Sequence, residues 1–239
     1  MKINILLCDT FPGLLPDYIP DYQSLFFDLF DSLRDNIEYE IYNAFEGKLP
    51  NNLYSNELYI IPGSQSGAYE DKEWIKRLFT FIQEANNKKI PLVGICFGHQ
   101  VIAQALGGKV QKSDKGWGIG IRIANIVSSD TDQYFPYGKM QLIYNHNDQV
   151  VELPKGAQHF ATSHFCENEG FTIDNHILTF QGHPEYTKEY CKYLLEKHRD
   201  SQNEELVINA LHSLHTMQNM GEYAAKWMLD LVERQLKHL

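Results

Sequence analysis

Short apolar runs alternate with helical patterns through the first hundred residues of this 239-residue chain. Buried strands are predicted at Ile3–Cys8, Leu58–Ile61 and Ile90–Val93, and the apolar spacing over residues 21–34 and 71–86 predicts helices. A helix between successive strands is the usual crossover that lets those strands pair in parallel. The alternation therefore predicts a parallel sheet with helices on both of its faces.

The pattern changes between about residues 109 and 180, where β-like runs are separated by Gly, Asn and Asp. These runs predict hairpins of an antiparallel section, after which 177–183 rejoins the sheet. The tail over 187–237 predicts two or three helices. The predicted fold class is α/β, a flavodoxin-like open and mostly parallel sheet flanked by helices, with an antiparallel β section and a helical C-terminal cap. We expect one domain over residues 1–190 and a helical extension over 191–239 that packs on the same domain.

One cysteine stands at a predicted strand-to-helix turn. The segment Gly94–Gln100 has the sequence GICFGHQ, follows the apolar run Ile90–Val93 and leads into a helical pattern at Val101. A nucleophile at such a sharp turn needs small neighbours, because its strained backbone is accommodated by flanking glycines. The helix N-terminus favours the thiolate, which is the form of cysteine that attacks. The pattern predicts Cys96 as a nucleophile.

A second motif, QGHPE at Gln181–Glu185, ends the apolar run Ile177–Phe180. His183 and Glu185 are two residues apart, so on an extended segment their side chains point to the same side. An imidazole base oriented by a carboxylate would complete a catalytic triad with Cys96.

A lone cysteine between a strand and a helix more often belongs to the core, and the downstream His183 motif is what favours catalysis at Cys96. The other cysteines have no neighbouring base, so we expect them to be structural: Cys8, Cys166 and Cys191. His99 lies on the elbow itself and is expected to pack the helix rather than act as the base. His212 and His215 could share a metal, but no third ligand is evident and no metal site is predicted.

Composition narrows the classes of partner. The formal net charge of −10 argues against nucleic-acid or anionic-membrane surfaces, because both need basic patches. No apolar run approaches the ~20 residues that span a bilayer. The chain has no CxxC motif, and Asp9 interrupts the first apolar run too early for a signal peptide, so we expect free thiols in a reducing cytoplasm. No phosphate-binding loop is recognisable, and no cofactor is predicted.

Together these motifs resemble those of the class I, triad-type glutamine amidotransferases, over nearly the first 190 residues. The elbow around Cys96 is similar to that family's nucleophile motif, and Gln181–Glu185 is similar to its His-Pro-Glu motif. The segment Asn145–Val150 (NHNDQV), before Leu153-Pro154, looks like its His-x-Asp-x-Val segment. Within the family the chain looks most like the free-standing members related to the glutaminase domain of GMP synthase, a group that includes γ-glutamyl peptidases.

The resemblance implies a role for each member of the triad. Cys96 would attack the δ-carbonyl of a γ-glutamyl amide and form a thioester, His183 would move the protons, and Glu185 would orient the imidazole.

The resemblance also implies the groups that bind the substrate. Backbone N–H groups of Phe97 and of Gly63 or Ser64 would stabilise the oxyanion. The turn Ile61–Ser64 (IPGS) departs from the Gly-Gly-Pro type sequence of the family, which makes the assignment of Gly63 weaker than that of Phe97. The positions where the family binds the glutamyl portion are held here by Gln100, Trp117, Gly118, His146 and Asn147.

Three functions remain open from the sequence. The first is a hydrolase or transferase that acts alone on glutamine or a γ-glutamyl conjugate, because the chain has a triad and no second domain for ATP chemistry. The second is a glutaminase subunit that supplies ammonia to a separate synthetase. The third is a non-catalytic regulatory module on the same fold, although such modules usually lack the cysteine or the histidine. The expected partners are a γ-glutamyl small molecule and, for the second function, a synthetase; neither nucleic acid nor membrane is expected.

Overall fold

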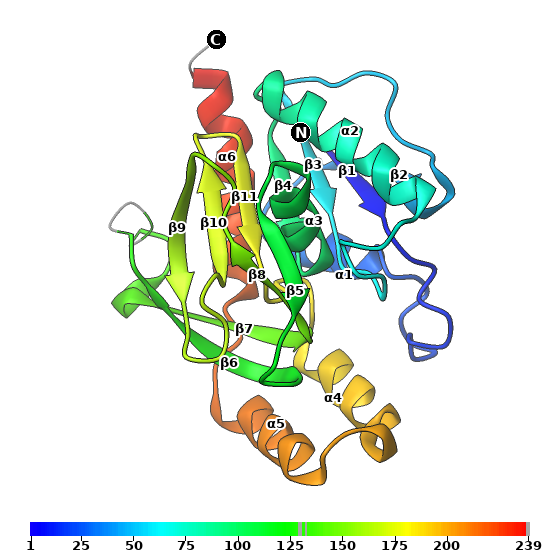
Figure 1. Ribbon diagram of the computed structural model, residues 1–239, viewed down its shortest axis with the longest axis vertical. Coiled ribbons are helices and arrows are strands. Elements are labelled where there is room, and N and C mark those ends of the chain that lie inside the picture. The colour runs from blue at the N-terminus through cyan, green and yellow to red at the C-terminus, as the bar shows by residue number, and fades with distance from the viewer. Residues whose placement is uncertain (129–130, 132, 238–239) are drawn as a thin grey trace.

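The computed structural model of the protein describes residues 1–128, 131 and 133–237. Within these residues, nine strands form one sheet in the order β2-β1-β3-β4-β11-β10-β9-β6-β7 (Figure 1). The first five strands of this order are parallel, as predicted: β2 (Glu38–Asn43), β1 (Lys2–Leu7), β3 (Glu57–Ile61), β4 (Leu92–Ile95) and β11 (Ile177–Phe180). Counted along the chain, their order is the 2-1-3-4-5 order of flavodoxin-like sheets.

The predicted antiparallel section is confirmed, and most of it continues the same sheet beyond β11. Its strands pair antiparallel with their neighbours: β10 (Gly170–Ile173), β9 (Ala157–Thr162), β6 (Gly118–Ile126) and β7 (Lys139–His146). A separate two-stranded ladder joins β5 (Lys109–Lys112) to β8 (Asp148–Glu152). This ladder brings residue 148 next to residue 112, beside the carboxyl end of the parallel strands.

Helices cover both faces of the parallel strands (Figure 1). One face carries α1 and α6 and the other carries α2 and α3: α1 (Ser24–Asp31), α6 (Gly221–Lys237), α2 (Glu73–Asn87) and α3 (Phe97–Ala105). Successive side chains of a strand point to opposite faces. Ile3 and Ile5 of β1 therefore belong to the core under α1 and α6, whereas Leu6 belongs to the core under α2 and α3.

The predicted helical C-terminus forms α4 (Lys188–Lys197), α5 (Glu204–Thr216) and α6, so the predicted boundary between residues 190 and 191 falls inside α4. The Thr187 hydroxyl caps α4 by accepting a hydrogen bond from the N–H of Tyr190 at 3.0 Å. In Figure 1, α4 and α5 lie at one end of the molecule, where Ser213 of α5 accepts a hydrogen bond from the Ile121 N–H of β6, whereas α6 returns to the face of the parallel strands. α6 is thus a layer of the α/β core and not part of a cap.

The described residues contain no helix that is both long enough and apolar enough to traverse a bilayer.

Candidate active site

Three loops meet at one edge of the sheet. β3, β4 and β11 are parallel neighbours, so the residues that follow them lie side by side at their carboxyl ends. Gly63 follows β3, Cys96 follows β4, and His183 follows β11. The register pairs Ile95 with Phe180, which brings the cysteine and histidine loops together although 87 positions separate them.

The backbone of Cys96 adopts φ 54° and ψ −104°, in a region that residues other than glycine rarely occupy. Hydrogen bonds on both sides hold this strained conformation: the Cys96 N–H donates to the Phe180 carbonyl at 2.8 Å, and the Cys96 carbonyl accepts from the Gln100 N–H at 3.1 Å. The side chain is 7% exposed. Strain that is held at one thiol in this way is typical of a nucleophile elbow.

The glycines flanking Cys96 have a different physical reason from the one predicted. A Cβ on Gly98 would lie 1.8 Å from the Ile61 carbonyl oxygen, and a Cβ on Gly94 would lie 2.5 Å from the Gly98 carbonyl oxygen. Neither glycine has a positive φ. They allow β3, β4 and α3 to approach closely, while the strain sits on the cysteine itself.

The His183 and Glu185 side chains are in direct contact and almost fully buried. Nδ1 of His183 lies 2.7 Å from Oε1 of Glu185. Burial lowers the pKa of the imidazole, but the charges of Glu185 and Cys96 and hydrogen bonds to both outweigh it and raise the pKa of His183 to about 10. The backbone N–H of His183 donates to the Ile143 carbonyl at 2.7 Å, which fixes this segment against β7. Both Glu185 and Cys96 therefore favour the imidazolium form of His183.

Two tyrosines complete the surroundings of the triad, and sequence reasoning missed both. The Tyr22 hydroxyl donates to Oε1 of Glu185 at 2.7 Å, and the Tyr186 ring stacks on the His183 ring with centroids 3.9 Å apart. Phe11 stacks in turn on Tyr22 at 3.8 Å. Tyr22 falls inside the range 21–34 predicted for the first helix, which begins only at Ser24, and nothing local marked it as a site residue.

The turn that carries Gly63 lies against the triad. A Cβ on Gly63 would lie 3.0 Å from Cε1 of His183 and 3.9 Å from Cβ of Cys96. Glycine is therefore the residue that lets this backbone reach the reacting groups, even though the surrounding sequence departs from that of the family.

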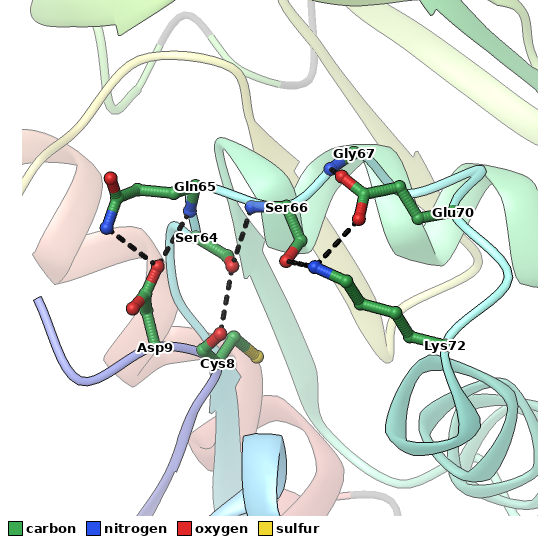
Figure 2. A network of polar contacts seen from close by, with 8 residues as sticks. All are labelled: Cys8, Asp9, Ser64, Gln65, Ser66, Gly67, Glu70 and Lys72. Carbon is green, nitrogen blue, oxygen red and sulfur yellow. Dashed lines mark hydrogen bonds and ion pairs between the residues drawn. The ribbon is translucent and has the colours of Figure 1, made fainter.

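Figure 2 shows how the same turn is tied to the end of β1. The Ser64 hydroxyl donates to the Cys8 carbonyl at 2.9 Å and accepts from the Ser66 N–H at 3.1 Å. The Asp9 carboxylate accepts from the backbone N–H of Gln65 at 3.0 Å and from its side-chain amide at 3.3 Å. These bonds leave the Gly63 peptide little freedom to move away from Cys96.

A second set of polar contacts holds the far end of the turn (Figure 2). Glu70 accepts from the Gly67 N–H at 2.6 Å and pairs with Lys72 at 2.7 Å, and Lys72 also donates to the Ser66 hydroxyl at 2.9 Å. The turn is thus held at both ends by contacts within the chain itself.

A cavity of about 570 Å³ opens onto Cys96 and His183. The predicted residues Gln100, Trp117, His146 and Asn147 all line it. The fifth predicted residue, Gly118, is not among the lining residues; a Cβ there would lie 2.6 Å from the Phe165 ring and 3.0 Å from Nε2 of His146, so glycine leaves room for these two side chains.

His146 is buried and neutral. Burial lowers the pKa of His146 to about 4, although the Asp148 carbonyl, 3.1 Å from Nδ1, partly opposes this effect. With the proton on Nδ1, the other ring nitrogen, Nε2, is an acceptor, and it has no hydrogen-bond partner among the described residues. Gln100 is differently placed: its Nε2 already donates to the Asp148 carbonyl at 2.7 Å and to Oε1 of Gln181 at 3.1 Å.

The side chain and the backbone of Phe97 have different surroundings. Its ring packs into the core against Trp74 with centroids 5.6 Å apart, while its backbone N–H opens helix α3 directly after the nucleophile. His99 is also a packing residue: Nδ1 lies 2.9 Å from the Thr179 hydroxyl, the ring contacts Phe171, and burial lowers the pKa of His99 to about 3.

The remaining cysteines are free and buried, and burial raises the pKa of each thiol: Cys8, Cys166 and Cys191. Across the part of the chain that the structure describes, no group of three or more His, Cys, Asp or Glu side chains is placed to hold a metal ion.

The sequence of the chain is similar to that of known proteins. The sequence model of the family described as glutamine amidotransferase class-I matches residues 28–198. The chain belongs to this family. As a class-I glutamine amidotransferase it is 33% identical over 209 residues to a Saccharomyces cerevisiae protein whose name describes it as a glutamine amidotransferase, a match that covers 83% of each chain.

Relatives with other names are also similar to this class-I glutamine amidotransferase. Gamma-glutamyl peptidase 3 of Arabidopsis thaliana is 32% identical over 168 residues, which cover 67% of this chain and 68% of that protein. The glutamine-hydrolyzing GMP synthase subunit of Sulfolobus acidocaldarius is 38% identical over 97 residues, which cover 40% of this chain and 51% of that protein. A solved glutamine amidotransferase structure from Thermotoga maritima has the same fold, with a TM-score of 0.76 over 99% of this chain and 98% of that one at 23% identity.

Proposed function

We propose that the protein breaks the γ-glutamyl amide bond of glutamine or of a γ-glutamyl conjugate through a thioester on Cys96. The main observation behind this proposal is the strained Cys96 beside the buried His183–Glu185 pair, with Cys96 and His183 both lining a cavity. Membership of the class-I glutamine amidotransferases supports the choice of bond.

The reaction divides into two half-reactions. Sγ of Cys96 attacks the δ-carbonyl carbon, and the C–N bond breaks as the His183 imidazolium protonates the departing nitrogen. A water then attacks the thioester carbon while neutral His183 takes its proton. The products are glutamate and the Cys96 thiolate, which again faces the His183 imidazolium. The raised pKa of His183 favours the imidazolium that the first half-reaction needs.

Backbone N–H groups of Phe97 and Gly63 are assigned to the oxyanion. The Phe97 N–H is one of the N-terminal donors of α3, and these donors lack a partner within the helix. The absent side chain of Gly63 leaves its peptide open toward Cys96. Each such donor typically contributes about 3 kcal/mol to transition-state stabilisation.

The glutamyl head is assigned to the polar side of the cavity. Nε2 of His146 and Oδ1 of Asn147 are buried acceptors without a partner among the described residues, and an ammonium group would satisfy them. Trp117 covers this side, while Gln100 holds the Asp148 segment in place.

The test is amine or ammonia release from glutamine and a panel of γ-glutamyl amides. Cys96→Ala is expected to lower the rate by roughly a thousandfold or more, because the nucleophile is lost. Cys166→Ala is the matched control: it removes a buried thiol whose raised pKa makes it a poor nucleophile, and the rate should stay near that of the wild type. An electrophilic glutamine analogue should label the peptide that contains Cys96. Hydrolysis that survives Cys96→Ala would refute the mechanism.

A glutaminase subunit that supplies ammonia to a separate synthetase is the second candidate. The similarity to the GMP synthase subunit of Sulfolobus acidocaldarius favours it. Such a protein would hydrolyse glutamine slowly by itself and faster when a synthetase is added. Full-rate hydrolysis by the isolated chain, unchanged by a synthetase, would exclude this role.

A further inference from the structure

We propose that one lobe of the cavity binds the departing half of the substrate, and that this half is an uncharged amine with an apolar body rather than ammonia. This inference rests on the proposed cleavage at Cys96 and specifies its substrate class. We define the α4 lobe as the part of the cavity that is lined by Phe11, Leu14, Tyr186, Tyr190 and Leu194.

The chemistry of the first half-reaction decides which side of the cavity receives the amine. The proton that releases the amine comes from His183, so the departing nitrogen must lie beside that imidazole. Whatever extends beyond the nitrogen then meets the side chains around His183. The nearest of these is Tyr186, whose ring is stacked on the imidazole at 14° between planes.

α4 extends this apolar wall away from the triad. Tyr190, Leu194 and His198 are spaced four residues apart along the helix and its C-cap, and all three line the cavity. Residues with this spacing share one helix face. The Tyr190 ring packs edge-on against Tyr186 at 4.8 Å, so the wall is continuous from the imidazole outward.

The opposite wall is supplied by the segment after β1. Phe11 and Leu14 line the cavity, and contacts with α4 anchor their segment: the Lys197 ammonium donates to the Gly13 carbonyl, and Tyr193 donates to the Leu15 carbonyl at 3.4 Å. The two walls are therefore joined, and the lobe is a built feature of the chain.

The α4 lobe favours an uncharged amine because its described walls carry no charged side chain. The charged residues among the described lining of the cavity, Lys112 and Asp148, belong to the β5–β8 ladder; the α4 lobe and its rim, which consists of His198, Ser201 and Gln202, contain no Asp, Glu, Lys or Arg among the described residues. An amine with a charged tail would lose water here without a partner of opposite charge. Oε1 of Gln202 is buried and has no hydrogen-bond partner among the described residues, so it can accept a donor beyond the apolar body.

Ammonia would leave the lobe unused. The cavity of about 570 Å³ also has to hold the glutamyl half, but ammonia, close in size to a water molecule with its share of roughly 30 Å³, is too small to extend from the imidazole along the wall formed by Tyr190 and Leu194. An apolar body that displaces water from these aromatic and leucine walls gains binding energy that ammonia lacks. The lobe thus favours γ-glutamyl conjugates over glutamine.

The experiment compares four amides: glutamine, a γ-glutamyl arylalkylamide, a γ-glutamyl diaminoalkane with a cationic tail and a γ-glutamyl aminoalkanoate with an anionic tail. We expect kcat/KM for the arylalkylamide to exceed that of each other amide by about tenfold or more, a difference typical of an apolar pocket. Equal or better turnover of glutamine, or preference for a charged tail, would overturn the inference.

Two variants test the walls. Leu194→Ala should reduce the preference for the arylalkylamide over glutamine by about tenfold, because the lobe loses an apolar contact. Leu211→Ala, which removes a partly buried leucine of α5 away from the cavity, should leave the preference as it is. Gln202→Lys at the more exposed rim should shift preference toward the anionic tail. No change in either preference would contradict the assignment of the lobe.

A binding measurement separates this inference from the proposed function. Cys96→Ala protein should bind the arylalkylamide more tightly than glutamine in calorimetry, whether or not the wild type cleaves either. If the wild type hydrolyses no amide but this order of affinity holds, the proposed function fails and the lobe assignment stands. If hydrolysis occurs without this order, the lobe assignment fails alone.

Discussion

At the scale of single residues, the hydrogen bond from Tyr22 to Glu185 leads to a specific prediction. The Tyr22 hydroxyl donates to the same Glu185 oxygen that contacts His183, and Oε2 of that carboxylate has no partner among the described residues. Hydrogen bonds to charged groups contribute about 1.5–3 kcal/mol. Tyr22→Phe should therefore lower kcat/KM about tenfold, with KM nearly unchanged because Tyr22 does not line the cavity.

The pH dependence of that variant distinguishes positioning from packing. The Tyr22 hydroxyl shares the negative charge of Glu185, so its loss leaves more of that charge to stabilise the imidazolium. The pKa of His183 should rise, and the alkaline limb of the pH–rate profile should move to higher pH. Tyr18→Phe, on the same segment but exposed, is the control and should change neither quantity. An unshifted profile in Tyr22→Phe would mean that the tyrosine only packs.

At the scale of elements, the contact between α3 and β3 depends on Gly98. A Cβ at this position would lie 1.8 Å from the Ile61 carbonyl oxygen, and backbone cannot yield as a flexible side chain can. Gly98→Ala should destabilise the fold by roughly 3 kcal/mol or more, as over-packing of a tight site does. Urea denaturation would measure this change in the free energy of unfolding, provided that the m-value is the same in the variant and the wild type.

Gly107 offers the comparison for this element. It has φ +92°, but nothing lies within 4 Å of its added Cβ, so Gly107→Ala meets backbone strain alone and should cost about 1–2 kcal/mol. Equal stability losses in the two variants would show that the approach of α3 to β3 is looser than described.

At the scale of the whole molecule, α6 joins the two halves of the sheet into one core. The Trp227 ring contacts Phe160 of β9 at 4.8 Å, Phe180 of β11 at 5.9 Å and Tyr134 at 4.9 Å. Trp227→Ala should lower the free energy of unfolding by about 3–5 kcal/mol and keep a single transition by near- and far-ultraviolet circular dichroism. Lys226→Ala, its exposed neighbour, should cost far less. A separate transition for the C-terminal helices would contradict one shared core.

Much of the fold was predictable because its signals are local. Apolar runs separated by helical spacing involve only a few neighbouring residues, and they led to the parallel strands near their observed bounds, although β4 (Leu92–Ile95) begins two residues after the predicted run Ile90–Val93. The cysteine elbow was equally predictable, since a strand, a small-residue turn and a helix follow one another directly. The function of the elbow glycines was not, because Gly98 is explained by a carbonyl of Ile61 on another strand.

What the sequence alone determined is which candidate reacting groups follow the strands at the carboxyl edge of the sheet: Cys96 after one strand, and His183 with Glu185 after another. Tertiary structure decided what surrounds them. The contact of Tyr22 with Glu185 spans 163 positions, and the α4 lobe combines a helix near residue 190 with a loop near residue 11. Sheet register and helix packing set such contacts, and both depend on the burial of the whole apolar surface rather than on any neighbouring residues.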